Sequence, residues 1–386
     1  MQRIARFLVC LATVVVVGCA PTPPRPIETK ALWHDAHFVA RDLADAAEIL
    51  TANDAMRDYL RKDIARQLRR DGPMRGLVAA LEKDSQLKLD YDAAVTRTAA
   101  QAFSARQGNC LSLTLMTASL ARELGLPVRY RKVITDENWS RRNEMLVSAG
   151  HVNILIEASG AEGLNGTSRG MIVDFLPGSD ILRQRAITID EATVLAMFMN
   201  NRAVESIAAG DADSAYAWLK LAIAQAPRVT ESYNTLGVLY QRRAMLAEAE
   251  TVYRAVLDRE PENITALANL AGVLERLGQM DDAALIMSRL RRIEPHPPLY
   301  YFDEGVAALK RGEYEEAEQQ FERELARNAE HSQSLAGLAV AKYRQGKPAD
   351  GQRHLAAALA AAVDVDERRI YADKMAWLTR QKTVQQ

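Results

Sequence analysis

Three side chains in the first half of the chain make up the set that a nucleophilic enzyme site uses: the thiol of Cys110, the imidazole of His151 and the carboxylate of Asp174. A cysteine thiolate attacks a carbonyl carbon, a histidine moves the proton, and an aspartate holds the imidazole ring and balances its charge. We therefore expect Cys110 to be the nucleophile, His151 the base and Asp174 the orienting group.

Cys110 is the only cysteine that follows the first nineteen residues. Secreted proteins normally use cysteines in disulfide pairs, so an unpaired thiol outside the cytoplasm is either buried and inert or reactive. His151 and Asp174 have plain alternatives as well, as a structural histidine and as a turn or capping residue. The three types in this order favour a catalytic site over three separate structural roles.

The segment after Cys110 predicts the element that presents the thiol. Residues 111–124 are apolar on nearly every side, which is typical of a buried central helix, and Gly125 ends the pattern. Cys110 is then at the N-terminus of that helix. The partial positive charge and free N–H groups of a helix N-terminus favour the thiolate form of a cysteine.

Apolar, β-branched runs predict the strands that present the other two residues. His151 begins one such run and Asp174 lies inside the next one. A buried aspartate is costly unless it is paired, and the imidazole of His151 is its natural partner. The charged segment 136–149 is expected to be a loop. The predicted strands are 128–134, 151–156 and 170–175, and the predicted upstream helices are 38–50, 56–68 and 74–81 within the mostly helical residues 31–105.

Four short motifs in this region resemble the transglutaminase-like superfamily, a papain-like group of cysteine enzymes. They are RQGNCLS at 106–112, GLPVRY at 125–130, GHV at 150–152 and VDF at 173–175. The resemblance implies an α+β papain/transglutaminase-like fold and acyl transfer at a peptide or side-chain amide, either by hydrolysis or by transfer to an amine. Among oxyanion donors it implies the backbone N–H of Cys110, with Gln107 and Asn109 as side-chain candidates.

The N-terminus resembles a bacterial lipoprotein leader. Two arginines precede an apolar run that is too short for a comfortable membrane span, and the run ends in VVGC at 16–19. This implies that Cys19 is lipidated, as by diacylglycerol and palmitate, and becomes the mature N-terminus. The Pro-rich stretch that follows is suited to a stiff tether, and Ala20 is typical of sorting to the outer membrane, facing the periplasm. The alternative is an ordinary signal peptide or a membrane anchor.

Composition excludes several other classes of function. The net charge is −1 with acidic and basic residues interleaved, which argues against nucleic-acid binding. We find no acidic loop of the Asp-x-Asp-x type, and His34 and His37 lack a third nearby ligand. We therefore expect no metal and no cofactor, with His34 and His37 on the surface of a helix.

The second half of the chain repeats every 34 residues from Ala196. The eighth position is always Ala or Gly, at 203, 237, 271, 305 and 339, and so is the twentieth, at 215, 249, 283, 317 and 351. The twenty-fourth is large and apolar, at 219, 253, 287, 321 and 355. Glycines share the fifteenth position at 210, 278, 312 and 346, and prolines the thirty-second at 227, 261 and 295. Small residues let paired helices approach closely, and the pattern resembles the tetratricopeptide repeat.

These observations predict an ordered set of segments. They are a leader at 1–18, a Pro-rich tether at 19–30, the transglutaminase-like domain at 31–195, five repeats forming an all-α solenoid at 196–364 and a capping helix at 365–381. Such solenoids usually offer a groove to a protein or peptide partner. We expect a lipid-anchored enzyme of the bacterial cell envelope. The alternative is a non-catalytic envelope scaffold or assembly factor that acts through the repeats.

Overall fold

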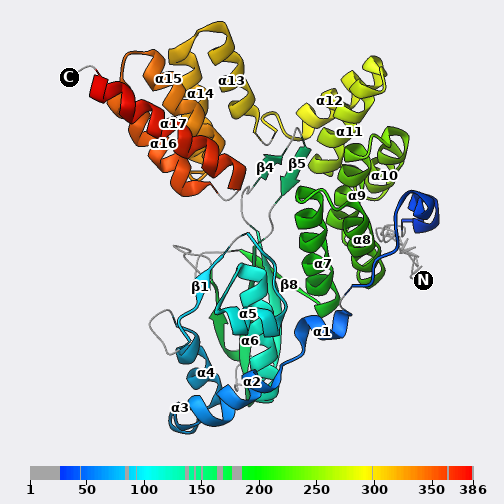
Figure 1. Ribbon diagram of the computed structural model, residues 1–386. Coiled ribbons are helices and arrows are strands. Elements are labelled where there is room, and N and C mark those ends of the chain that lie inside the picture. The colour runs from blue at the N-terminus through cyan, green and yellow to red at the C-terminus, as the bar shows by residue number, and fades with distance from the viewer. Residues whose placement is uncertain are drawn as a thin grey trace, which may run out of the picture.

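The computed structural model describes residues 27–43, 45–82, 87–92, 94–134, 139–142, 145–148, 151–162, 168–175, 185–297, 299–362 and 365–384. A domain of helices and strands comes first, and helix pairs make up the rest of the chain (Figure 1). The predicted leader at 1–18 and the predicted lipidation site, Cys19, lie outside the described residues. Within the described ranges, no helix combines the length and apolarity that a bilayer span requires.

Helix α6 (Cys110–Glu123) is the centre of the first domain. Eleven consecutive residues, Leu111 to Ala121, are buried, as the apolar pattern predicts. On one side α6 packs against a sheet, and on the other it packs against short helices. These helices are α1 (Ala46–Leu50), α2 (Asp54–Asp58), α4 (Pro73–Leu81) and α5 (Ala99–Ala105). A π-helical turn η3 (Tyr59–Asp63) and α3 (Ala65–Asp71) connect α2 to α4.

The sheet has four antiparallel strands in the order β7-β6-β3-β8. Its members are β3 (Val128–Val133), β6 (His151–Glu162), β7 (Ser168–Val173) and β8 (Ala186–Ile189). A separate two-stranded parallel pair joins β1 (Asp90–Tyr91) to β2 (Gln107–Gly108) just before α6. The prediction that Asp174 lies inside a strand is wrong by one residue, because β7 ends at Val173.

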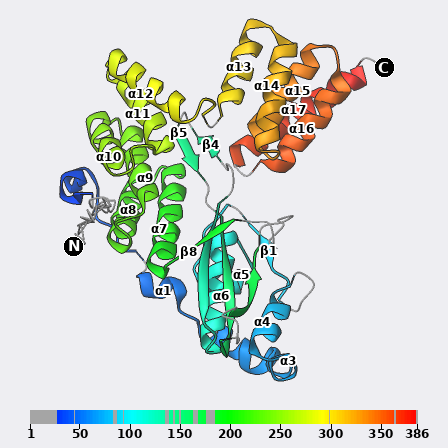
Figure 2. The same cartoon turned by 180° about the vertical axis from the view of Figure 1, so that it is seen from behind.

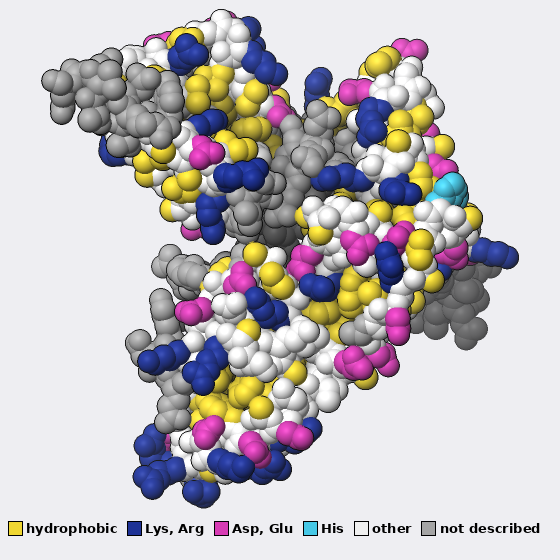
Figure 3. Space-filling view, in the orientation of Figure 1, with side chains coloured by type: hydrophobic (Ala, Val, Ile, Leu, Met, Phe, Trp, Pro, Cys, Tyr) yellow, Lys and Arg dark blue, Asp and Glu magenta, His cyan; other side chains and the backbone are white. Residues whose placement is uncertain are grey.

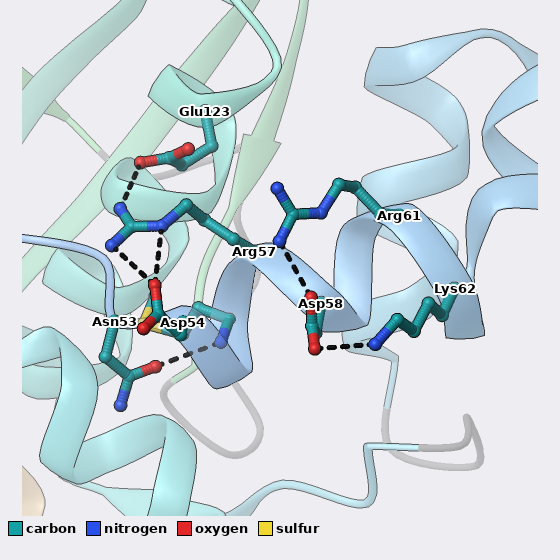
Figure 4. Close-up of polar contacts among 8 residues, drawn as sticks. Asn53, Asp54, Arg57, Asp58, Arg61, Lys62 and Glu123 are labelled. Carbon is teal, nitrogen blue, oxygen red and sulfur yellow. Dashed lines mark hydrogen bonds and ion pairs between the residues drawn. The ribbon is translucent and has the colours of Figure 1, made fainter.

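Polar contacts at the surface attach α2 to the far end of α6 (Figure 4). Asn53 caps α2 by accepting a 2.9 Å hydrogen bond from the Met56 N–H, and Arg57 donates to Asp54 and to Glu123, each at 3.2 Å. Arg57 of α2 therefore joins the two helices, because Glu123 is the last residue of α6. Exposed ion pairs of this kind contribute little free energy each, so they orient α2 more than they stabilise it.

The expectation of a loop at 136–149 is wrong, because a hairpin forms there. Its strands are β4 (Trp139–Arg142) and β5 (Met145–Ser148), which pair in antiparallel register. The hairpin leaves the first domain and β5 contacts α11 (Ile264–Arg276). Both views place it between the helices up to α12 and those from α13 onward (Figures 1 and 2).

The segment before α1 also differs from its prediction. Residues 38–43 form no helix, because contacts with the outside of the repeats hold them instead. Phe38 stacks on Tyr216 with ring centroids 4.0 Å apart, and the Val39 N–H donates to Asp213 at 3.0 Å. Further upstream, Ile27 is already buried, so the predicted tether is packed from that residue onward, and the chain passes through 3₁₀ turns η1 (Thr29–Leu32) and η2 (Asp35–His37).

From Glu191 the described chain forms five successive helix pairs and a last helix. The pairs are α7 (Glu191–Ala208) and α8 (Ala212–Gln225), α9 (Thr230–Arg242) and α10 (Leu246–Arg259), α11 and α12 (Met280–Ile293), α13 (Tyr300–Arg311) and α14 (Tyr314–Arg327), and α15 (Ser332–Arg344) and α16 (Pro348–Ala361), followed by α17 (Val365–Val384). The first begins ahead of the predicted boundary at 195, where Asp190 caps it. On the face in Figure 3, basic and acidic side chains are interspersed over these helices.

Candidate active site

The N-terminus of α6 is fixed by the residues that lead into it. Asn109 is the N-cap, and its Oδ1 accepts hydrogen bonds from the Ser112 N–H and hydroxyl, both at 2.9 Å. Its amide donates to the Thr96 hydroxyl at 2.8 Å. Gly108 allows this close approach, since a Cβ there would lie 2.7 Å from the Cβ of Ser112. Cys110 is therefore held as the first residue of α6, partly exposed and without a disulfide.

Strand register brings His151 and Asp174 to one face of the sheet. Ile154 of β6 pairs with Val173 of β7, so Asp174, one residue on, lies opposite Asn153. Alternation along β6 places His151 on the same face as Asn153, two residues away. The geometry agrees, because the His151 Nε2 is 2.9 Å from both carboxylate oxygens of Asp174 and the Asn153 amide donates to Asp174 Oδ2 at 2.9 Å.

Both members of this pair are out of solvent. The His151 side chain is 3% exposed and that of Asp174 is 0% exposed. A buried carboxylate requires hydrogen-bond donors, and His151 and Asn153 provide them. The Nδ1 of His151 has no hydrogen-bond partner among the described residues. Because Nε2 is committed to Asp174, Nδ1 is the ring nitrogen that remains for the thiol.

The pKa of the His151 ring depends on both Asp174 and Cys110. Burial alone lowers the pKa of His151, but the hydrogen bond to Asp174 and the influence of Cys110, with the negative charges of both, raise it to about 9. An imidazole with this pKa carries its proton at neutral pH. The three predicted residues, Cys110, His151 and Asp174, thus interact, with the carboxylate on Nε2 of the imidazole and Cys110 acting on the same ring.

The predicted oxyanion side chains are placed differently. Asn109 is occupied as the helix cap, because both ends of its amide are hydrogen-bonded inside the fold. Gln107 lies in β2 opposite Asp90, half-buried. Sequence reasoning missed Asn153, whose position two residues after His151 on a strand would have indicated it.

Other predicted features lie away from this site. Instead of lying on a helix, His34 donates its backbone N–H to the Tyr216 hydroxyl at 2.9 Å, and His37 ends a 3₁₀ turn next to it. In the part of the chain that the structure describes, no group of three or more His, Cys, Asp and Glu side chains is arranged to hold a metal ion.

Comparison with known proteins identifies the two halves of the chain separately. Residues 62–161 match the model of the transglutaminase-like superfamily. Residues 244–301 and 302–362 match models of the tetratricopeptide repeat. The chain therefore contains a transglutaminase-like domain followed by tetratricopeptide repeats.

Individual known proteins match only part of the chain. A STIP1 homolog of Dictyostelium discoideum is 28% identical over 151 residues, which cover 37% of this chain and 25% of that protein, so the chain spans a quarter of its relative's length. A tetratricopeptide-repeat protein of Thermus thermophilus is 20% identical, with 46% of this chain and 97% of that one covered and a TM-score of 0.34. PilF of Pseudomonas aeruginosa is 17% identical, with coverage of 50% and 90% and a TM-score of 0.33.

Proposed function

We propose that this protein is a membrane-anchored cysteine enzyme of the bacterial envelope. Cys110, His151 and Asp174 transfer the acyl group of a peptide or side-chain amide to water or to an amine. The repeats bind a protein or peptide partner and so bring the substrate to the first domain. A lipid on Cys19 holds the molecule at the outer membrane, facing the periplasm.

The observation that carries this proposal is the state of the His151 ring. Its Nε2 is bound by Asp174 at 2.9 Å, while its Nδ1 is buried and has no hydrogen-bond partner within the described part of the chain. Leaving a buried polar atom without a partner costs about 1–3 kcal/mol, so it requires an explanation. A nitrogen that exchanges a proton with the neighbouring thiol explains it.

The chemistry follows from these atoms. The Cys110 sulfur bonds to the carbonyl carbon, and the π pair of the carbonyl moves onto its oxygen. When this intermediate collapses, the amine leaves with the proton from Nδ1 of His151, and a thioester remains on Cys110. Water or an amine then attacks the thioester, His151 takes its proton, and Cys110 leaves as the thiolate. Asp174 keeps the ring oriented throughout and stabilises its positive charge.

An acyl-enzyme trap tests this proposal without knowledge of the natural substrate. The chain, purified in detergent, is mixed with p-nitrophenyl acetate and its mass is measured. We expect one acetyl group on the tryptic peptide that contains Cys110, and its removal when water or a primary amine is supplied. Identification of acetate or of the acetylated amine then distinguishes hydrolysis from transfer.

The matched controls are Cys110→Ser and His151→Ala. The first variant should take up no acetyl group at residue 110, and the second should take it up far more slowly. Absence of acetylation in the wild-type chain, or equal rates in wild type and His151→Ala, would contradict the proposal. Either result would instead favour a scaffold that acts only through its repeats.

A further inference from the structure

The strand that begins with His151 lies between the sheet and the hairpin of β4 and β5. In the antiparallel pair of β3 and β6, His151 is opposite Val133, the last residue of β3. The chain between these two residues contains the hairpin, whose last pair is Arg142 with Met145. From Met145 to His151 the chain spans at most about 20 Å. His151 is therefore at the end of one strand pair and a short distance from another.

The repeats contact this part of the chain on both sides of His151. On one side, the Lys132 ammonium forms an ion pair with the Glu231 carboxylate of α9, and Lys132 is opposite Val152, the neighbour of His151. On the other side, β5 of the hairpin contacts α11. The end of the β3–β6 pair that carries His151 is thus held between two helices of the repeats.

The helix that presents Glu231 is itself firmly packed. Successive first helices of the repeats contact one another, α7 with α9 and α9 with α11. Every residue of α9 from Ser232 to Gln241 is buried. Glu231 is in the first turn of α9, where the partial positive charge of the helix N-terminus favours a carboxylate. A charge in this position is fixed in space by the repeats.

The Lys132–Glu231 pair acts on the backbone of the sheet and not on the imidazole ring. Side chains alternate along a strand, so Lys132 and Val152 lie on the face opposite to Val133 and His151. The two charged side chains are 33% and 47% exposed, so the pair orients β3 more than it stabilises the fold. Burial raises the pKa of Glu231, but the charge and the hydrogen bond of Lys132 lower it below its ordinary value, so the pair is ionised at neutral pH.

We propose that Glu231 is a positioning residue for His151. Through Lys132, and together with the contact of β5 with α11, it fixes the strand end from which the His151 ring reaches Asp174 at 2.9 Å. The inference rests on the proposed function for the role of His151 in catalysis. It gives the repeats a second task besides partner binding, because a partner that separates Lys132 from Glu231 changes the candidate active site.

The test measures the pKa of His151 by NMR of the imidazole rings in the full chain, purified in detergent. Glu231→Lys and Lys132→Glu each break the ion pair, so the strand end becomes less ordered and the hydrogen bond to Asp174 weakens. In both variants we expect the pKa of His151 to fall from about 9 towards its ordinary value of 6.5. The double variant Lys132→Glu/Glu231→Lys restores an ion pair and should restore the pKa.

The matched control is Glu250→Lys in α10. It reverses the charge of a glutamate that pairs with Arg254 at 2.7 Å in the same repeat as Glu231, and it should leave the pKa of His151 unchanged.

A direct effect of the added charges gives a different result. A positive charge lowers the pKa of a histidine and a negative charge raises it, so charge alone would make Glu231→Lys and Lys132→Glu shift His151 in opposite directions. Opposite shifts, or no shift in either variant, overturn the inference. A fall in both variants that the double variant does not reverse also overturns it, because it shows general damage to the fold.

Acylation of Cys110 by p-nitrophenyl acetate, measured on the same samples, separates this inference from the proposed function. We expect each single reversal to slow acylation on the order of tenfold and the double variant to restore the rate. A wild-type chain that is not acylated contradicts the proposed function, whereas the pKa of His151 still decides whether Glu231 positions the ring. Normal acylation with an unmoved pKa in every variant contradicts the inference alone.

Discussion

His151 binds its proton more tightly in the folded chain than in the unfolded one. Its folded pKa is about 9, against 6.5 for the ordinary imidazole. A group with a raised folded pKa contributes stability that is fully present below the unfolded pKa and is lost as the pH rises through the folded pKa. The contribution of His151 is therefore complete below about pH 6.5 and disappears by about pH 9.

The change Asp174→Asn should remove much of this pH dependence, because the carboxylate is the strongest cause that raises the pKa of His151. Between pH 6.5 and 9 we expect the free energy of unfolding of the wild type to fall by on the order of 3 kcal/mol relative to the variant. Urea denaturation across this range measures the difference. Asp190→Asn, at the cap of α7, is the control and should leave the slope unchanged.

Parallel pH profiles for the wild type and Asp174→Asn would contradict the assignment of His151 and Asp174 as a coupled pair. Asp174→Asn also lowers the free energy of unfolding by a constant amount at every pH. That constant loss does not affect the comparison, because only the change of the free energy of unfolding with pH measures proton binding by His151.

The contact of His151 with Asp174 could be predicted from side-chain type and from the place of each residue at the edge of a strongly patterned element, whereas the catalytic roles of Cys110, His151 and Asp174 stay predictions. The use that the fold makes of Asn109 was not predictable in this way. Asn109 precedes the nucleophile, yet the fold uses it to cap α6. The parallel pair of β1 and β2 was not predictable either, because a strand pair two residues long leaves no periodic pattern in the sequence.

At the scale of elements, close contacts between paired helices explain which types of residue occupy the repeat positions. A Cβ on Gly237 would lie 2.5 Å from the Tyr253 ring, and one on Gly305 would lie 2.7 Å from the Phe321 ring. The small residue at the eighth position of a repeat therefore faces the large residue at the twenty-fourth. This relation is why the all-α architecture of the second half could be predicted from the sequence.

The fifteenth position of each repeat offers a test of the turn geometry. Gly210, Gly278, Gly312 and Gly346 all have φ between 77° and 79°, and in the second repeat Ala244 adopts a φ of 57° at the equivalent place. A Cβ is disfavoured in this left-handed region. We expect Ala244→Gly to stabilise the protein by about 1 kcal/mol, measured by thermal or chemical unfolding.

The control is Ala247→Gly, three residues later and exposed on α10, where φ is helical. That change should destabilise the protein by about 0.5–1 kcal/mol, since glycine in a helix loses more backbone freedom on folding. Destabilisation by both substitutions would contradict the account of Ala244 as a strained turn residue.

Two elements were not predictable from local pattern. The hairpin of β4 and β5 forms in a charged segment and contacts α11, far along the chain. Residues 38–43 have helical spacing but form no helix, because Tyr216 and Asp213 of α8 bind Phe38 and the Val39 N–H. In both cases long-range contacts outweigh local propensity.

At the scale of the molecule, the two predicted halves are not separate bodies. One continuous hydrophobic core runs from Ile27 through α6 to Leu290 in α12, and α13 to α17 have smaller cores of their own. The division in packing thus falls after α12, within the repeats, and the domain boundary at 195 stays a prediction. Period and composition could not indicate this, because the repeat pattern continues across the division.

The N-terminal segment determines which side of the molecule an anchor would approach. The Tyr240 hydroxyl donates to the Leu32 carbonyl at 2.6 Å and Lys220 pairs with Asp35 at 2.7 Å, so the segment is bound to α8 and α9. Under the proposed lipidation of Cys19, residues 20–26 span less than about 30 Å. The outer side of the first repeats would then face the membrane.

The most direct test of the central claim is the rate at which iodoacetamide alkylates Cys110 as a function of pH, followed on the tryptic peptide by mass spectrometry. The account predicts rapid alkylation below about pH 7, where an ordinary thiol is still protonated, and a large loss of that rate in both His151→Ala and Asp174→Ala. A rate that rises only at alkaline pH and is the same in the wild type and both variants would contradict an activated Cys110–His151–Asp174 site.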